Sequence, residues 1–310
     1  MAAIRLAWRL QRAELLFCLG LCGSLAAVAV WLAWDMRSEL VGCGTAQAAA
    51  ACEFVYPFQE SHGSAVQLLQ LVIGLVPYGL GLVLGVPLVA REVEHRTALI
   101  AWPLAGSRRR WFAWRAIPVI VAGLVLVAVL AFAAGQMNQA YLPKSDLGFL
   151  LYDGRGLPLV MRAFVALVVG AAIGALIGRV LPALLVVIAL SVAISTGLGA
   201  VLDRWVPSRE LSAEQSPMNG VGGVLTTEVH YRLPDGRVVD AQEGEIMAEA
   251  IYQESGGAEP DPSTLPQPLF YGIAADRYGE VVLRESLALG GLALVVAGAA
   301  TVILERRRPE

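Results

Sequence analysis

The chain has 310 residues, of which 57% are hydrophobic and only 16% are charged, and its formal net charge is −3. Soluble domains average about 45–50% apolar and 25% charged residues, so this composition excludes an ordinary soluble globular protein. It indicates a polytopic membrane protein, for which we expect membrane lipid and other proteins as partners, and no nucleic acid.

The first residues form a basic amphipathic segment. Arg5, Arg9 and Arg12 fall on one face of a helix, and Trp8 falls near the opposite face. This spacing predicts that residues 1–13 form a helix lying in the membrane interface. A basic flank that only anchors the first span is the alternative. No cleavable signal is predicted, because the apolar run that follows has no short core ending in a small-residue cleavage site.

Six apolar segments have about the 20 residues that a helix needs to cross the hydrocarbon core. Pro77 predicts a kink in the second, because proline removes a backbone donor. Gly170, Gly174 and Gly178 recur at intervals of four in the fourth and predict tight helix contact. The expected fold class is an all-α polytopic membrane protein with about six transmembrane helices, at about 14–34, 64–90, 116–136, 158–178, 181–202 and 281–304.

A larger polar segment, residues 203–280, separates the fifth and sixth spans. Residues 224–240 alternate around Leu233-Pro234-Asp235-Gly236, which predicts a hairpin, and residues 241–254 are helix-like. We therefore expect a small extracellular α/β cap. The domain organisation is an interfacial helix (1–13), five transmembrane helices (14–202) containing a cytoplasmic segment (91–115), an extracytoplasmic loop domain (203–280), and a last helix with a basic tail (281–310).

The cysteines and histidines do not form a predicted metal site. Cys18 and Cys22 lie one helical turn apart in the first span and are expected to be small packing residues. Cys43 and Cys52 lie in one loop, where they form a disulfide on an oxidising face or stay free, and the sequence leaves both open. His230 has no second His or Cys nearby, so no metal is expected.

The distribution of arginine predicts the orientation. More than half of the 23 Lys and Arg residues lie in the N-terminal tail, residues 91–115, the turn at Arg179 and the C-terminal tail. By the positive-inside rule these segments are cytoplasmic. We therefore expect a multi-pass plasma membrane protein with both termini in the cytoplasm and residues 203–280 outside.

Motifs for catalysis are missing from the sequence. It contains no phosphate-binding loop, no Gly-x-Ser-x-Gly elbow and no His-Glu-x-x-His. Charged residues such as Glu14, Arg162 and Arg284 fall near the ends of the spans, where we expect their side chains to reach the interface. Secondary transporters usually show ionisable groups at mid-membrane. We therefore predict that this chain is not an enzyme and that any transport draws energy from a separate protein.

The segment 85–118 carries the clearest pattern, with an acidic turn followed by a basic cluster with tryptophan. It reads Ala90-Arg91-Glu92-Val93-Glu94-His95-Arg96-Thr97, then Leu99-Ile100-Ala101-Trp102, then Ser107-Arg108-Arg109-Arg110-Trp111. This resembles the segment between spans two and three of ABC-2 type permeases, especially actinobacterial exporter subunits. The resemblance extends to the whole topology. The chain departs from the family pattern at Arg96, where glycine is usual, and at Pro103-Leu104.

The resemblance implies a permease subunit of an exporter, paired with a second permease copy and with separate subunits that bind ATP and Mg. This chain itself would hold no cofactor. Glu92, Glu94, His95 and Thr97 would lie on a short helix docking into the ATPase, whose closure would tilt spans two and three. Arg108, Arg109 and Arg110 with Trp111 would anchor the segment to anionic headgroups. A charged positive-inside loop without a coupling role is the alternative.

Other functions are weighed against the exporter. The apolar spans favour an amphipathic or apolar substrate. A membrane-embedded sensor or assembly protein, with residues 203–280 binding a ligand outside, is the alternative function. A lipid-modifying enzyme lacks a nucleophile, base or metal cluster in the sequence.

Overall fold

The structure is a computed structural model. It describes residues 2–40, 55–95, 97, 107–141, 149, 152–206, 208–212, 225–254, 260–261 and 263–306. Cys43 and Cys52, for which the sequence leaves open a disulfide or free thiols, lie outside these residues, as does most of the stretch between His95 and Ser107.

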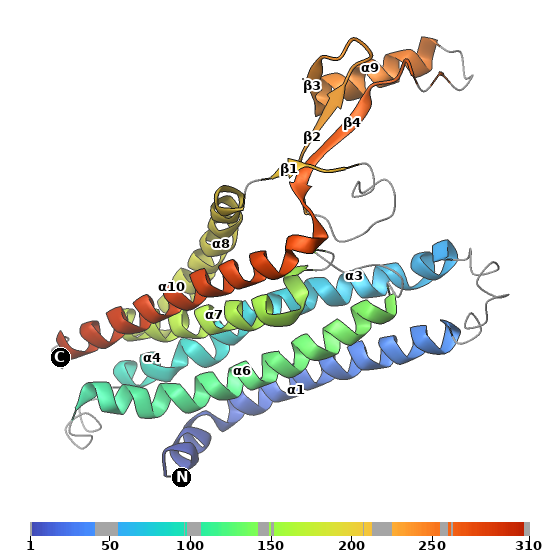
Figure 1. The fold of residues 1–310 in the computed structure, drawn as a ribbon. Helices are drawn as coiled ribbons and strands as arrows, with labels where there is room; N and C mark the ends of the chain where they lie inside the picture. Colours follow the sequence, from blue (N-terminus) through green and yellow to red (C-terminus); the bar gives the residue numbers. More distant parts are fainter. Residues whose placement is uncertain are drawn as a thin grey trace. The chain divides into compact units, whose positions relative to one another are not determined.

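The chain divides into two compact units. The first comprises Met1–Pro143, Leu151–Gly197 and Val282–Glu310, and the second comprises Lys144–Leu150 and Leu198–Val281. Long helices make up the first unit (Figure 1), with the elements α1 (Ala2–Leu40), α3 (Val55–Leu80), η2 (Gly81–Gly85), α4 (Pro87–Glu94), α6 (Arg108–Tyr141), η3 (Tyr152–Gly154), α7 (Gly156–Ile177), α8 (Val180–Trp205) and α10 (Tyr278–Arg306). The last residues of α8 and the first of α10 belong to the second unit.

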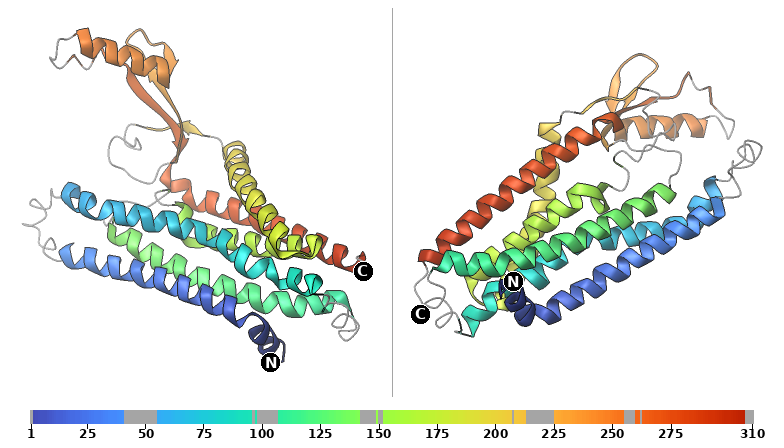
Figure 2. Two further views of the ribbon diagram at one scale, coloured as in Figure 1. Left: turned by 180° about the vertical axis from the view of Figure 1, so that it is seen from behind. Right: turned by 60° about the horizontal axis from the view of Figure 1, so that its bottom comes forward.

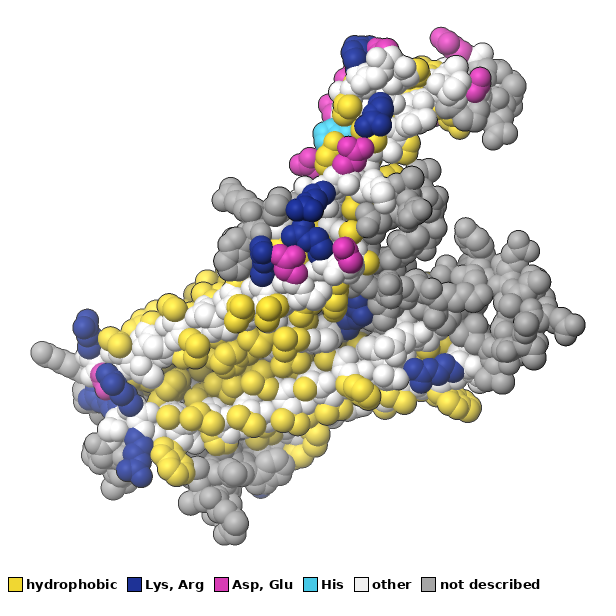
Figure 3. All heavy atoms as spheres, viewed as in Figure 1, with side chains coloured by type: hydrophobic (Ala, Val, Ile, Leu, Met, Phe, Trp, Pro, Cys, Tyr) yellow, Lys and Arg dark blue, Asp and Glu magenta, His cyan; other side chains and the backbone are white. Residues whose placement is uncertain are grey.

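The predicted spans are all helices. Among the described residues, five stretches are long and apolar enough to cross a membrane: Gln11–Ser38, Ser61–Glu94, Arg108–Tyr141, Gly156–Ile177 and Ala275–Arg306. The sixth predicted span corresponds to α8, whose 26 residues begin with the apolar stretch Val180–Ile194. Hydrophobic side chains cover the visible face of these helices, and arginines lie toward its ends (Figure 3). The all-α polytopic fold is therefore confirmed.

The first helix is broken near the predicted boundary of the interfacial segment. Gln11 has φ −127° and ψ 23°, which lie outside the helical range and separate a short N-terminal piece from the long remainder of α1. The sequence likewise predicts two separate helices here, one over residues 1–13 and one over residues 14–34. Whether the first lies in the membrane interface stays a prediction.

The core of the bundle lies among α1, α3, α6 and α7. In every view α1 and α6 run side by side (Figures 1 and 2), and α3 and α7 pack against α6. Cys18 and Cys22 are 1% and 2% exposed and belong to this core, as predicted for packing residues. The thiols fill space between the apolar side chains of this core.

The second span contains a π-helix where the sequence predicts a kink. The N–H of Val86 donates to the carbonyl oxygen of Gly81 at 3.1 Å, one residue further along the chain than in an α-helix. The distortion lies one turn after Pro77, which cannot donate a backbone hydrogen bond. A long apolar helix is therefore split into α3 and α4 within one span.

Glycine allows this π-helix to touch α7. A methyl group at Gly81 would lie 2.6 Å from the carbonyl oxygen of Ala166, and one at Gly85 would lie 2.8 Å from that of Leu167. From the α7 side, methyl groups at Gly170 and Gly174 would collide with the carbonyl oxygens of Gly81 and Val86. The predicted small-residue contact is present at these two glycines.

Gly178 has a different role from the one predicted. Its φ of 68° is left-handed, and its N–H donates to the carbonyl oxygen of Gly174 at 2.9 Å, so it ends α7. The chain turns there into α8 within two residues.

The second unit contains a four-stranded sheet with one helix. Its elements are β1 (Arg209–Glu210), β2 (Leu225–Arg232), β3 (Val238–Asp240), α9 (Ala241–Glu254), β4 (Gln267–Ile273) and η6 (Ala275–Arg277). The strand order is β1-β4-β2-β3, and every pair is antiparallel. The predicted hairpin is β2–β3, and the predicted helix is α9.

The hairpin turn is set by local chemistry. Gly236 has φ 87°, and the N–H of Leu233 donates to the carbonyl oxygen of Arg237 at 2.8 Å. The backbone N–H of Arg237 donates to the Asp235 carboxylate at 2.9 Å and lowers the pKa of that group. These contacts explain why this turn could be predicted from four residues.

Candidate functional site

The end of α4 contacts three other helices. We call this end of the bundle, which holds Glu14, Arg91, Arg108 and Glu305, the terminal end, because both chain termini lie toward it. The opposite end, which holds Arg37, Gln70, Asn138 and Glu285, is the distal end.

Arg91 at the terminal end forms an ion pair with Glu14 of α1, whose side chain is 12% exposed. Glu14 is thus neutralised by a partner from α4.

Glu92 makes the most buried contact at this end. It forms an ion pair with Arg115 of α6, and the two side chains are 15% and 12% exposed. The Arg115 guanidinium lies 5.3 Å from the centre of the Trp111 ring, a cation–π distance. Among the described residues the second carboxylate oxygen of Glu92 has no hydrogen-bond partner. The Glu92–Arg115 pair therefore joins α4 to α6 with little access to water.

Glu94 reaches the start of α8. Its carboxylate accepts a hydrogen bond from the backbone N–H of Val180 at 3.1 Å. The first N–H groups of a helix lack partners within the helix, and the helix dipole favours an anion there. Glu94 therefore caps α8 from a different helix.

The last two predicted coupling residues lie beyond the end of α4. His95 ends the helix, with its N–H donating to the carbonyl oxygen of Arg91 at 2.9 Å. The hydroxyl of Thr97 donates to the carbonyl oxygen of Glu92 at 3.3 Å. Both residues are exposed, unlike Glu92.

The basic cluster at the start of α6 has partners within the protein. Nη1 of Arg108 donates to the carbonyl oxygens of Leu304 and Glu305, at 3.1 and 3.0 Å, and so caps the end of α10. Nη2 of Arg109 donates to the Glu305 carboxylate at 2.6 Å. Arg108 and Arg109 thereby join α6 to α10, in addition to any contact with lipid headgroups.

Aromatic side chains accompany this cluster. Arg110 lies 5.9 Å from the centre of the Trp114 ring. Trp111 is 8% exposed and packs in the core, whereas Trp114 is 52% exposed. Of these two tryptophans, Trp114 is exposed enough to contact the membrane interface. The burial of Trp111 does not support the anchoring role predicted for it.

A second polar cluster lies at the distal end, inside the bundle and not at its surface. Arg162 of α7 donates from Nε to the Glu285 carboxylate at 3.0 Å, and Tyr152 of η3 donates to the same carboxylate. Glu285 is fully buried and the Arg162 side chain is 14% exposed. The expectation that Arg162 extends to the interface is therefore wrong, because a buried acid on α10 holds it inside the bundle.

A neutral polar pair is connected to this cluster through η3. Nε2 of Gln70 on α3 donates to Oδ1 of Asn138 on α6 at 2.6 Å, and both side chains are buried. A methyl group at Gly154 of η3 would overlap the Gln70 amide. The short η3 element therefore contacts Gln70 through Gly154 and Glu285 through Tyr152.

The sequence held a signal for the distal cluster. Arg284-Glu285-Ser286 are three consecutive polar residues followed by a long apolar run, and two of them, Glu285 and Ser286, are buried. Intramembrane charges usually pair with one another. The partner, 123 positions earlier in the chain, could not be identified from spacing.

The described residues contain no group of three or more His, Cys, Asp or Glu side chains placed to hold a metal ion. His230 lies 3.4 Å from Glu228 and packs edge-on against Tyr271, with ring centres 5.4 Å apart. His230 therefore makes contacts with its neighbours on the sheet.

Comparison with known proteins identifies the family to which the helical part of the chain is similar. The family model described as "ABC-2 membrane transporter related" matches residues 19–202, which include α3, α4, α6 and α7 together with α1 from residue 19 and α8 up to residue 202. No match was found among curated proteins or among solved structures. Members of such a family are membrane permeases that work with an ATP-binding subunit. The chain therefore belongs to the ABC-2 membrane transporter related family and is a multi-pass permease component of an ABC transporter.

Proposed function

We propose that this permease works as an exporter, as a dimer of permease copies on a dimer of separate subunits that bind ATP and Mg. The substrate is amphipathic or apolar, since the described spans offer mostly hydrophobic side chains. In this proposal the terminal end is cytoplasmic, because it collects the arginines of the N-terminal, middle and C-terminal segments.

The observation that carries the proposal is the set of contacts made by one turn of α4. Arg91 pairs with Glu14 of α1, Glu92 pairs with Arg115 of α6, and Glu94 caps α8. A displacement of this turn must move or break three contacts to three helices. The end of α4 is thus suited to distribute a push from an ATPase across the bundle.

The π-helix supports a lever-like motion of α4. Regular α-helix is interrupted at Gly81–Gly85, and the backbone there lies directly against α7. A π-helix within a span is often found at functional sites. We infer that α4 tilts about this contact while α3 keeps its packing.

The coupling residues divide into two roles in this scheme. His95 and Thr97 are exposed beyond α4 and would contact the ATPase. Glu92, which pairs with Arg115, and Glu94, which is exposed but caps α8, would transmit its movement. Arg108 and Arg109 hold α10 and, with Arg110 and Trp114, face the headgroups of the cytoplasmic leaflet.

The test is purification of the tagged protein in mild detergent, with identification of bound proteins and measurement of ATP hydrolysis. We expect an ATP-binding subunit to co-purify. Thr97→Pro should reduce the amount bound, because it changes the contact surface. Glu92→Gln should keep the subunit bound but uncouple hydrolysis from substrate, because it removes the charge that pairs with Arg115.

Glu245→Gln, an exposed acid on α9, is the matched control and should change neither readout. A preparation without an ATP-binding subunit would contradict the exporter. Equal loss of binding in Glu92→Gln and Thr97→Pro would contradict the division of roles.

A further inference from the structure

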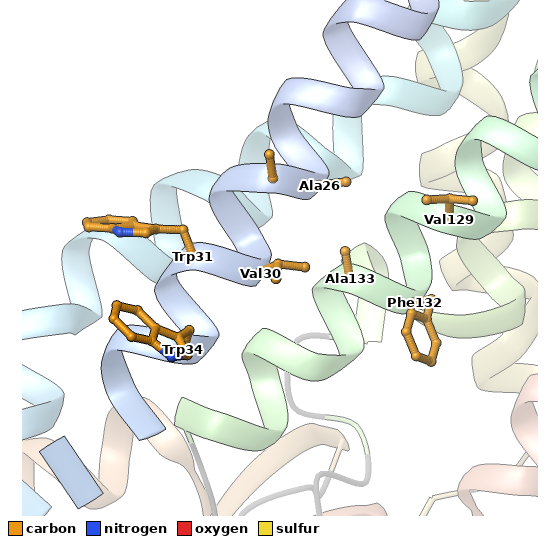
Figure 4. Close-up of a pocket in the computed structure, with 8 residues that line it drawn as sticks. Ala26, Val30, Trp31, Trp34, Val129, Phe132 and Ala133 are labelled. Carbon is orange, nitrogen blue, oxygen red and sulfur yellow. The ribbon is translucent and has the colours of Figure 1, made fainter. Parts of the chain in front are cut away.

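An apolar groove runs along the surface between α1 and α6 toward the distal end (Figure 4). Its volume is about 600 Å³, and its lining comes from two helices: Ala26, Ala27, Val30, Trp31, Trp34, Val129, Phe132 and Ala133. In the close-up Trp31 and Trp34 leave α1 on one side, Val30 points toward Ala133 of α6, and Phe132 projects from α6. Small residues thus form the floor and aromatic residues form the rims.

A polar contact closes the distal end of this groove. Nη2 of Arg37 donates to Oε1 of Gln136 at 2.9 Å, joining α1 to α6 one turn beyond Trp34 and Phe132. Arg37 is exposed, and both of its described hydrogen bonds come from Nη2. The guanidinium carries further donors on Nε and Nη1 that match the geometry of a phosphate.

The length of the groove identifies the kind of molecule that fits. The lining on α1 runs from Ala26 to Trp34, about 12 Å at 1.5 Å per residue, and Arg37 lies about 4 Å further along the helix. Half of the hydrocarbon core is about 15 Å thick, which is the reach of an acyl chain in one leaflet. The groove therefore matches one acyl chain in length, and the Arg37 guanidinium at its end matches the phosphate of a lipid headgroup.

We propose that this groove is a binding site for one phospholipid, with its phosphate on Arg37 and Gln136 and an acyl chain along Trp31, Trp34 and Phe132. The site lies at the distal end and is separate from the headgroup contacts of Arg108 to Arg110. It does not depend on the exporter assignment, since it needs only that α1 and α6 span the bilayer.

Native mass spectrometry of the full chain tests the site after purification and reconstitution in nanodiscs of phosphatidylcholine with phosphatidylglycerol. We expect one phospholipid per chain to survive release from the nanodisc. Arg37→Gln should lower its retention about fivefold, as expected for one arginine at a headgroup. Ala27→Trp should abolish retention by filling the groove with a side chain from its exposed lining.

Leu71→Trp provides the matched control, because Leu71 is 63% exposed on α3, away from the groove. Equal lipid retention in Arg37→Gln, Ala27→Trp and the unmodified chain would overturn the site. So would an equal loss in Leu71→Trp, which would show only general surface lipid. A smaller dimer signal in Ala27→Trp, with unchanged lipid retention, would show that a second copy of the chain occupies the groove and would overturn the lipid site.

A second measurement does not depend on the stability of these variants. Phospholipid brominated on its acyl chain should quench the fluorescence of the unmodified chain more than that of a Trp31→Phe, Trp34→Phe variant. The excess quenching should persist when the brominated lipid is a minor component. Quenching that is simply proportional to its mole fraction would contradict a preferred site.

Discussion

The two ends of the helical unit hold their charges in different ways. At the terminal end, the Arg109–Glu305 pair is 62% and 40% exposed, so water and headgroups share in stabilising it. At the distal end, Glu285 is fully buried and the Arg162 side chain is 14% exposed. Charges removed from water must stabilise one another, because desolvation costs several kcal/mol per ion. The exposed Arg109–Glu305 contact is therefore suited to change during a cycle, and the buried Arg162–Glu285 contact to maintain the arrangement of helices.

Helix α10 is held by an exposed contact at one end and by a buried contact at the other. Arg108 caps its last turn at the terminal end, and Arg162 holds its first turns at the distal end through Glu285. Between these ends its exposed face includes Leu287, Leu294 and Val295. The difference between its two attachments can be measured by removing them one at a time.

The largest effect is expected from Glu285→Ala. It leaves the Arg162 guanidinium buried without its acid, and breaking a buried ion pair costs about 3–5 kcal/mol. The midpoint of SDS-induced unfolding in mixed micelles should fall strongly. The double variant Glu285→Leu, Arg162→Met should recover most of the loss, because it removes both charges. A double variant less stable than Glu285→Ala would contradict the distal ion pair.

A smaller loss is expected from Gln70→Leu. The Asn138 amide then stays buried without its partner, at a cost of about 1–3 kcal/mol. Replacing both residues, Gln70→Leu with Asn138→Leu, should be nearly neutral for the same unfolding midpoint. If the double replacement lowers the unfolding midpoint twice as much as Gln70→Leu alone, the two amides do not act as a pair.

Glu94→Ala should cost about 1 kcal/mol, the usual loss for a helix cap. Its effect should appear as faster amide hydrogen exchange in the first turn of α8, with exchange in α7 unchanged. Glu94→Asp is the matched control, since it keeps the charge on a shorter side chain. Unchanged exchange at Val180 in Glu94→Ala would exclude the cap.

The smallest effect is expected from Arg109→Gln. Exposed ion pairs contribute about 0–1 kcal/mol and are screened by salt. The difference in unfolding midpoint from the unmodified chain should therefore vanish at high salt, whereas the loss in Glu285→Ala should persist. Equal salt sensitivity of the two variants would contradict the proposed difference between the exposed Arg109–Glu305 pair and the buried Arg162–Glu285 pair.

Many local features could be predicted from neighbouring residues. The spans follow from length and hydropathy, the β2–β3 turn follows from Pro234-Asp235-Gly236, and the end of α9 follows from the Gly/Pro-rich segment after it. Tight contact at Gly170 and Gly174 could be predicted from their spacing, since only a missing side chain allows backbones to touch. Patterns that act within one or two turns are visible in the sequence.

The sequence indicates the residues of the candidate site but not their contacts. Glu92 and Glu94 were singled out as a charged turn, yet their partners, Arg115 and the start of α8, required the packing of α4 against two distant helices. Pro77 indicated an irregular span, but the location of the π-helix depends on where α7 presents its glycines.

The sequence by itself determined that this protein is a bundle of apolar helices with basic segments at one end and a small sheet between its last two spans. Burial of apolar side chains and local turn chemistry depend on residues close in the chain. Only the tertiary structure decided which charges are buried together, as with Arg162 and Glu285, and where α1 and α6 leave a groove between Trp34 and Phe132. Such pairs depend on which helices become neighbours, and many combinations of helices satisfy the same hydrophobic pattern.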